Sequence, residues 1–380
     1  MKRNNLHSVG DKSIFDALCQ KNKVKNEDLR ELFLKRGILI SSKTKREDLA
    51  SEFSILIHDF DDFSALSDIL GTGTRREKKS SFEVESSASR SHFREAAHDL
   101  KKMLNDGPDE VFAEVRSKEF GTEIIIKYKS FNPNKNEFSQ YITKTATIEI
   151  EEINGRSNIR YPSNEDAENW AKKIPDFIKD NEEINYEIKE VSLSSITETK
   201  NRTGFFEELM KNMKNFEIED VTDVFVHNSK HAMTASDDDT EDTIIESDSD
   251  HEASSEVEVT ETRTGTHITK ASLKGEGVLD SRELSDLYRR GFFISNITWH
   301  ARRKNQPDSD IYVFNAEVSD PENFSGFRFQ YKGFYRYKTV GEYTKQIKQP
   351  DESDERSVNK EIEEAARVTV NQITSLYEEG

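Results

Sequence analysis

The chain has 380 residues, of which 33% are hydrophobic and 34% charged, and its formal net charge is -19. This composition predicts two or three domains, with solvated or disordered segments between them. The single cysteine, Cys19, excludes an intrachain disulfide framework and a cysteine-based zinc site. Because the sequence shows neither a signal peptide nor a run of about 18 apolar residues, we expect a soluble, cytoplasmic protein with no membrane partner.

Residues 1–70 predict a small all-helical module. Apolar residues recur at helical spacing in "SIFDALCQKN", "NEDLRELFLKRG" and "KREDLASEFSILIHDF", and "DFSALSDIL" adds a short fourth helix. Asn26 is a suitable N-cap for the second helix, and Gly37 is a suitable stop. The region is also basic, because Met1 to Arg46 contains 12 Lys/Arg against five Asp/Glu, a local charge of +7.

Residues 71–91 predict a flexible linker, because they are rich in Gly and Ser and include the charged run "RREKK". Residues 92–200 predict an α+β module. It opens with the amphipathic helix "HFREAAHDLKKMLN", and strands follow in "TEIIIKYKSF" and "QYITKTATIEIEEI", where apolar and polar residues alternate. A second helix, "SNEDAENWAKKIPDFI", has Trp170 as its core anchor, and the strand "INYEIKEVSL" closes the unit.

Residues 201–345 predict a second α+β module of antiparallel strands with packed helices. The helix "LDSRELSDLYRRG" is well marked, and "FFISNITWHA", "DIYVFNAEV" and "FSGFRFQYKGFYRYK" are its clearest strands. An acidic insertion, residues 236–262, interrupts the unit with 12 Asp/Glu and no Lys/Arg. Charge of this density predicts disorder, or else a phosphate mimic that competes for the protein's own basic surfaces. Residues 346–380 predict a linker and an amphipathic C-terminal helix that packs on the preceding module or docks a partner.

Within the basic N-terminal region, residues 24–53 resemble the SAP motif, a short helix–turn–helix module that binds DNA. The matching positions are a Leu-rich helix that ends in Arg-Gly-hydrophobic, a polar turn, and a second helix that opens on charged residues before a Leu: Leu29, Leu32, Arg36, Gly37, Ile38, Lys45 and Leu49. The turn "ILISSKT" lacks the motif's second Gly, and Ser42-Lys43 stands near its place.

This resemblance implies contact with DNA through five basic side chains, which we expect at one end of the helix pair: Lys35, Arg36, Lys43, Lys45 and Arg46. Such residues and helix N-termini contact phosphate oxygens, so binding would be salt-sensitive and would read few bases. The alternative is a helical module that docks a protein or oligomerises, with lysines that merely solvate its surface.

A second surface for nucleic acid could lie in the aromatic and basic run "FRFQYKGFYRYK", residues 327–338. There Phe327, Phe329 and Tyr331 share one strand face, while Arg328 and Lys332 share the other. Aromatic side chains beside basic ones stack nucleic-acid bases in RNA-binding sheets. The alternative, which we favour, is a central hairpin that buries its aromatic face. The nearby segment "WHARRKN", residues 299–305, adds three more basic residues.

One string of residues suggests catalysis. Pro175-Asp176 followed by Glu187-x-Lys189 matches the minimal PD-(D/E)xK nuclease pattern, in which Asp176 and Glu187 would hold a metal and Lys189 would help to activate water. The second half falls on a predicted strand, as this chemistry needs, but Asp176 falls on a predicted helix.

No phosphate-binding glycine loop, nucleophile elbow or zinc-protease helix is present in the sequence. We therefore predict an α+β chain that is non-enzymatic and needs no cofactor or metal. It would be a nucleic-acid-associated or adaptor protein, with a metal-dependent nuclease as the alternative. By elimination, we hypothesise a component of a larger complex, such as a prokaryotic defence complex, with a protein partner and with DNA contacted through residues 24–53.

Overall fold

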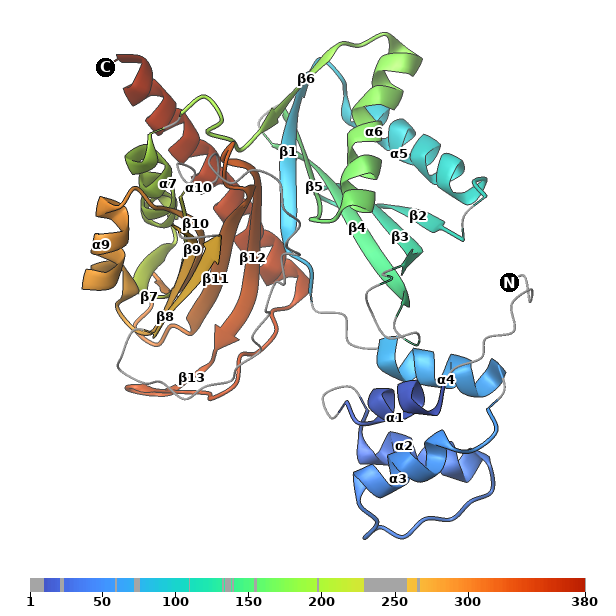
Figure 1. Ribbon diagram of the computed structural model, residues 1–380. Helices are drawn as coiled ribbons and strands as arrows, with labels where there is room; N and C mark the ends of the chain where they lie inside the picture. The colour runs from blue at the N-terminus through green and yellow to red at the C-terminus, as the bar shows by residue number, and fades with distance from the viewer. Residues whose placement is uncertain are drawn as a thin grey trace.

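The computed structural model has the predicted α+β architecture, with a helical module at the N-terminus, a large antiparallel sheet and a long C-terminal helix (Figure 1). It describes residues 10–20, 24–58, 60–71, 76–108, 110–131, 133, 138, 140–153, 156–196, 198–228, 258–264 and 267–379. Over these ranges, none of the helices combines the length and the apolar character needed to cross a membrane.

The N-terminal module, residues 10–71, contains four helices: α1 (Asp11–Leu18), α2 (Asn26–Lys35), α3 (Arg46–Ser54) and α4 (Phe60–Gly71). The residues that the helical spacing places on one side, among them Leu29, Leu32 and Leu49, form a common core. Phe33 and Phe53 meet edge to face at its centre, with ring centroids 5.2 Å apart. The predicted helical module is therefore confirmed in this part of the chain.

In the described part of the remaining chain, twelve strands form one antiparallel sheet. We call β1–β6 the N-terminal half-sheet and β7–β12 the C-terminal half-sheet. The strands, in their order across the sheet, are β2 (Phe112–Ser117), β3 (Gly121–Phe131), β4 (Tyr141–Ile153), β5 (Arg156–Pro162), β1 (Lys79–Ser86), β12 (Ser325–Tyr335), β11 (Ile311–Asp320), β10 (Phe293–Arg303), β7 (Phe216–His227), β9 (His267–Lys274) and β8 (Glu258–Thr264), while β6 (Tyr186–Glu190) pairs with β1. A separate short hairpin joins β13 (Tyr337–Thr339) and β14 (Glu342–Tyr343).

The predicted linker at 71–91 is wrong for most of its length. Its residues 79–86 form β1, which pairs with β5, β6 and β12 in the middle of the sheet. Phe82 and Val84 are buried there, and α5 already begins at Arg90. The strand is hard to recognise in the sequence because Phe82 and Val84 are the only apolar residues of "SSFEVES" and the others are Ser and Glu. Residues 72–75 lie outside the described ranges.

Two helices, α5 (Arg90–Asn105) and α6 (Glu165–Glu182), cover one face of the N-terminal half-sheet (Figure 1). Their apolar stripes pack on the inward residues of β3, β4 and β5 to form one core. Trp170, the expected anchor of α6, meets Tyr128 edge to face at 4.9 Å. The Asn164 side chain caps α6 by accepting a hydrogen bond from the Ala167 amide at 2.9 Å.

The C-terminal half-sheet has a core of its own, which it shares with α7 (Thr199–Asn212), a 3-10 turn (Val278–Asp280), α9 (Arg282–Arg289) and α10 (Glu352–Glu379). The aromatic run belongs to this core, because Phe327, Phe329 and Tyr331 are all buried. The favoured alternative, a hairpin with a buried aromatic face, is thus confirmed, and these rings cannot stack on nucleic-acid bases. Part of the predicted disordered insertion is wrong, since residues 258–262 belong to β8; residues 236–257 lie outside the described ranges.

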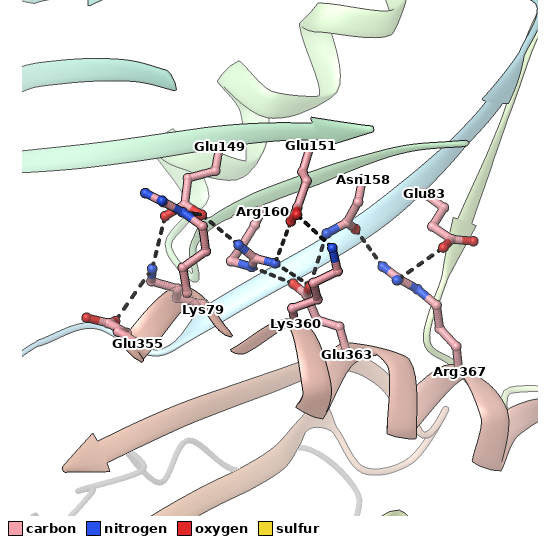
Figure 2. A network of polar contacts seen from close by, with 11 residues as sticks. Lys79, Glu83, Glu149, Glu151, Asn158, Arg160, Glu355, Lys360, Glu363 and Arg367 are labelled. Atoms are coloured by element: carbon pink, nitrogen blue, oxygen red, sulfur yellow. Dashed lines mark hydrogen bonds and ion pairs between the residues drawn. The ribbon is translucent and has the colours of Figure 1, made fainter. Parts of the chain in front are cut away.

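The two half-sheets meet at a polar joint. β1 and β12 share a single registered pair, Lys79 with Phe329, and the two apolar cores have no residue in common. The second face of the N-terminal half-sheet is charged, and the first half of α10 lies across it (Figure 2). Helix α10 therefore belongs to the core of one half-sheet and bridges to the other through polar side chains.

Arg160 on β5 is the centre of this bridge and is only 1% exposed. Its guanidinium donates to both carboxylate oxygens of Glu363 on α10, at 2.7 and 2.5 Å, and to Glu149 on β4 at 2.6 Å. Glu151 lies 3.6 Å away, and the Asn158 amide also donates to Glu363, at 3.0 Å. One buried cation is thus shared by three carboxylates, which makes its charge essential to the joint.

The buried charges depend on one another for ionisation. Burial by itself would raise the pKa of Glu363, but Arg160 outweighs it and holds this pKa below the ordinary value. Burial would likewise raise the pKa of Glu149, and Lys79 and Arg160 bring it below the ordinary value. The same carboxylates, led by Glu363, raise the pKa of Arg160 although burial opposes this.

Acid should therefore weaken the joint. Groups whose pKa is lowered by folding stabilise the fold above their unfolded pKa, near 4.5 for Glu363, and this stabilisation is lost as the pH falls through the folded value. We expect the free energy of unfolding in urea to fall by about 1–3 kcal/mol between pH 7 and pH 3.5 through this network. Glu363→Gln should show a smaller fall than the wild type, and an equal fall would contradict this assignment.

Candidate nucleic-acid interface

Helices α2 and α3 run in the same direction. At their beginnings, the Arg46 guanidinium donates to the carbonyl oxygen of Val24, two residues before α2 begins. At their ends, Arg36 contacts His58 at 3.0 Å, and these residues follow α2 and α3 respectively. The extended turn between the helices makes this parallel arrangement possible. It places both helix N-termini, with their partial positive charge, at one end of the module.

Basic side chains gather at this end. A recess of about 720 Å³ at the start of α2 is lined by Lys25, Asn26, Glu27, Arg30 and Arg46. The turn also reaches this place, because Arg30 donates to the carbonyl oxygen of Ser42 at 3.0 Å. Lys43 and Lys45, which follow Ser42 in the same turn, are exposed. We call Lys25, Arg30, Lys43, Lys45 and Arg46 the cationic end.

The expectation that the five predicted basic residues share one end of the helix pair is wrong. Lys43, Lys45 and Arg46 lie at the cationic end, whereas Lys35 and Arg36 lie at the opposite end, because α2 runs its full length between them. Lys35 is exposed and pairs with Glu31 one turn away, at 3.3 Å. Arg36 is partly buried, contacts Asp62 and His58, and stacks over the Phe53 ring at 5.1 Å.

Sequence reasoning missed two members of the cationic end, Lys25 and Arg30. A signal was available for Lys25, since it directly precedes the predicted N-cap at Asn26, where a backbone turn exposes the side chain. Arg30 is brought to the turn only by its contact with Ser42. Two acidic residues reduce the positive charge of the cationic end. Glu27 lines the recess, and Asp28 accepts a hydrogen bond from the Lys25 backbone amide at 2.6 Å.

Arg36 therefore has a structural role in this module. Arg36→Ala should lower the free energy of unfolding of the module by about 1–2 kcal/mol, because it removes a partly buried ion pair and a cation–π contact. Affinity for DNA should stay unchanged. Thermal unfolding measures the loss of stability, and fluorescence anisotropy with a DNA duplex measures the affinity. Lys35→Ala should change neither, and a loss of affinity in Arg36→Ala alone would place this residue in the interface.

The opposite end of the module is apolar. Five large apolar side chains are exposed around the ends of α2 and α3: Leu34, Ile38, Leu39, Ile55 and Ile57. Leu39 is 87% exposed and Ile57 94% exposed, which is unusual for side chains of this size. We call this group the apolar end.

The N-terminal module is also fixed to the sheet. Phe138, from the connection between β3 and β4, is only 2% exposed and belongs to the core of the N-terminal module. Its ring lies 5.1 Å from that of Phe63 on α4. A module that a flexible linker lets move freely, as residues 71–91 predicted, would not share an aromatic core contact with the sheet it is tethered to.

The nuclease string is not assembled as its chemistry requires. Asp176 lies inside α6, which continues to Glu182, and accepts a hydrogen bond from the Tyr186 hydroxyl. Glu187 and Lys189 lie on β6, where Lys189 pairs with Glu85 at 2.7 Å. The predicted helix at Asp176 and the predicted strand at Glu187 are therefore confirmed. Across the described ranges, no three His, Cys, Asp or Glu side chains gather as a metal ion would need.

Comparison of the chain with protein-family models, with curated proteins and with solved structures gave no match. The geometry of the N-terminal module therefore has to support any functional proposal.

Proposed function

We propose that this chain is a non-enzymatic, nucleic-acid-associated adaptor, a component of a larger complex whose N-terminal module contacts the DNA backbone through its cationic end. The observation that supports this most is a recess at the beginnings of two parallel helices, which Lys25, Arg30 and Arg46 line, with the exposed Lys43 and Lys45 in the adjoining turn. Backbone amides at helix N-termini and Lys or Arg side chains are the groups that bind phosphate oxygens. The resemblance of residues 24–53 to the SAP motif supports the same proposal.

Binding of this kind should be weak and strongly salt-dependent. Arg46 already donates to the carbonyl oxygens of Leu18, at 2.8 Å, and of Val24, so part of its donor capacity is used within the module. The neighbouring acidic residues reduce the local charge, and the whole chain carries -19. Each phosphate neutralised adds roughly 0.9 to the slope of log affinity against log salt. Three exposed lysines would thus account for a slope near 3, with little base preference.

The test uses the full chain and a 30-base-pair duplex, followed by fluorescence anisotropy at about 50 and 200 mM salt. Changing Lys25, Lys43 and Lys45 together to Ala should weaken binding about tenfold or more at low salt and reduce the salt slope by about 2–3. The matched control changes three exposed lysines of the remaining chain, Lys102, Lys173 and Lys200, to Ala. Undetectable binding by the wild type, or an equal loss in the control, would reject the proposal.

The apolar end supports a second candidate function, the docking of a protein partner. Exposed apolar side chains of this extent mark interaction sites more often than solvated surfaces. A photo-crosslinking residue at Leu39 should capture a specific partner inside cells, whereas one at Glu47, near the start of α3, should not. Capture of the same protein from both positions, or from neither, would contradict docking at this end.

A further inference from the structure

Helix α10 contacts both half-sheets, and the two sets of contacts differ in kind. Toward the C-terminal half-sheet α10 contributes to an apolar core, supplemented by a few polar contacts, whereas its contacts toward the N-terminal half-sheet are mainly ion pairs and hydrogen bonds. We propose that α10 is a releasable strap: when its charged contacts weaken, the two half-sheets separate about the β1–β12 contact, while each keeps its fold and α10 stays on the C-terminal half-sheet.

The attachment of α10 to the C-terminal half-sheet is extensive. Val358, Ile362 and Ala366 are buried in the core that β7–β12 and α7 form. At the start of the helix, Asp354 accepts a hydrogen bond from Arg303 at 2.6 Å, and farther along the Asn212 amide of α7 donates to Thr369 at 2.8 Å. Apolar burial of this extent contributes several kcal/mol, so α10 remains part of this half.

The attachment to the N-terminal half-sheet consists of ion pairs and hydrogen bonds. Besides the Arg160–Glu363 pair, Lys360 donates to Glu151 at 2.9 Å, and Arg367 pairs with Glu83 at 3.1 Å (Figure 2). The charged and polar groups that face each other across the joint come from β1, β4, β5, α10 and the residues just before β1: Arg76, Lys79, Ser81, Glu83, Glu149, Glu151, Asn158, Arg160, Glu355, Arg356, Lys360, Glu363 and Arg367. An aromatic ring also takes part, because the Arg356 guanidinium carbon lies 3.8 Å from the centroid of the Phe120 ring.

The other contacts across the joint are polar as well. Lys78 pairs with Glu317 at 2.5 Å, the Ser80 hydroxyl donates to the Phe327 carbonyl oxygen at 3.1 Å, and Gln330 donates to the Arg76 carbonyl oxygen at 2.9 Å. These lie along the single β1–β12 contact and can serve as the hinge. Interfaces between units of one chain that are polar and small permit relative motion.

A recess already lies between the two parts that would separate. It has a volume of about 530 Å³, and its lining comes from α10 on one side and from β1 and β5 on the other: Glu83, Arg156, Lys360, Glu364, Arg367, Val368 and Asn371. At this recess, therefore, Val368 and Asn371 of α10 face open space and not a packed surface of the N-terminal half-sheet. Separation of the halves would widen this recess without opening either apolar core, because the two cores are distinct.

The test measures the distance between the halves in the full chain. In a Cys19→Ser background, donor and acceptor dyes are placed at Lys102→Cys on α5 and Glu283→Cys on α9, both exposed positions. Single-molecule energy transfer then gives the distance distribution. Glu363→Gln, which keeps the shape of the side chain and removes its charge, should increase the population of the separated form about tenfold or more, and Arg160→Met should increase it further.

Arg303→Met is the matched control, because Arg303 also pairs with α10 but lies within the C-terminal half-sheet. It should leave the distance distribution unchanged. Distributions for Glu363→Gln and Arg160→Met that equal the wild type would overturn the proposal. So would separation accompanied by loss of the helical circular-dichroism signal, since that result would mean unfolding of a half. If Arg160→Met does not fold, Glu363→Gln still decides between these outcomes.

Discussion

Arg160→Met should lower the free energy of unfolding by about 3–5 kcal/mol, the largest effect we expect from a single change outside the apolar cores. Arg160 is 1% exposed and shared by Glu149, Glu151 and Glu363. Its removal leaves Glu363, itself 1% exposed, without its main counter-charge. A carboxylate buried without a partner costs far more than the original pair contributes, because desolvation is no longer offset.

Urea unfolding at pH 7 measures this loss. The double variant Arg160→Met with Glu363→Met should recover most of it, because both members of the pair are then replaced by apolar side chains of similar length. The coupling between the two sites in this cycle should be on the order of 2–3 kcal/mol. Additive effects would mean that Arg160 acts through Glu149 and Glu151 rather than through α10.

Phe138→Ala should destabilise the N-terminal module by about 3 kcal/mol or more, although Phe138 is far from that module in sequence. The ring is buried in the module's core and contacts Phe63. A core formed by only about 60 residues has little stability to lose. We therefore expect the module to unfold or to release from the sheet at temperatures where the two half-sheets remain folded.

Hydrogen exchange checks this expectation, because protection of the amides in α2 and α3 should fall while that of β10 and β11 persists. Phe131→Ala is the matched control: this residue lies at the end of β3, and its side chain is 54% exposed. It should change protection little. Unchanged protection of α2 and α3 in Phe138→Ala would restore the freely tethered module that residues 71–91 predicted.

Helical and strand periodicity predicted much of the fold because these patterns depend only on near neighbours. The helices of the N-terminal module, α6, α9 and α10 all follow apolar residues at helical spacing, and the aromatic strand β12 follows strict alternation. The strand β1 escaped detection because its apolar residues are few and its hydrogen-bonding partners lie in β5, β6 and β12, which are far away in sequence. Composition alone was therefore a poor guide to a linker.

The candidate site, too, was predicted only as far as local sequence patterns reach, and long-range packing decided the rest. Composition revealed a basic segment, but the direction of α2 relative to α3 decided which basic side chains share an end. Lys25 and Arg30 lie with Lys43, Lys45 and Arg46 at the cationic end, and Lys35 lies at the opposite end. Arg36 contacts Asp62 and His58 within the module. No local pattern can assign these roles, because an arginine that pairs within the fold and one that binds phosphate look alike in sequence.

By itself, then, the sequence determined the α+β class, the helical N-terminal module and the burial of the aromatic strand, all of which follow from periodicity over a few residues. Only the tertiary structure decided that β1 is central, that Phe138 fixes the module to the sheet, and that Arg160 and Glu363 bring α10 against the N-terminal half-sheet. The physical reason is that these contacts join residues separated by about 70 to 200 positions. Their charges and rings take on a role only when long-range packing removes them from water and brings them together.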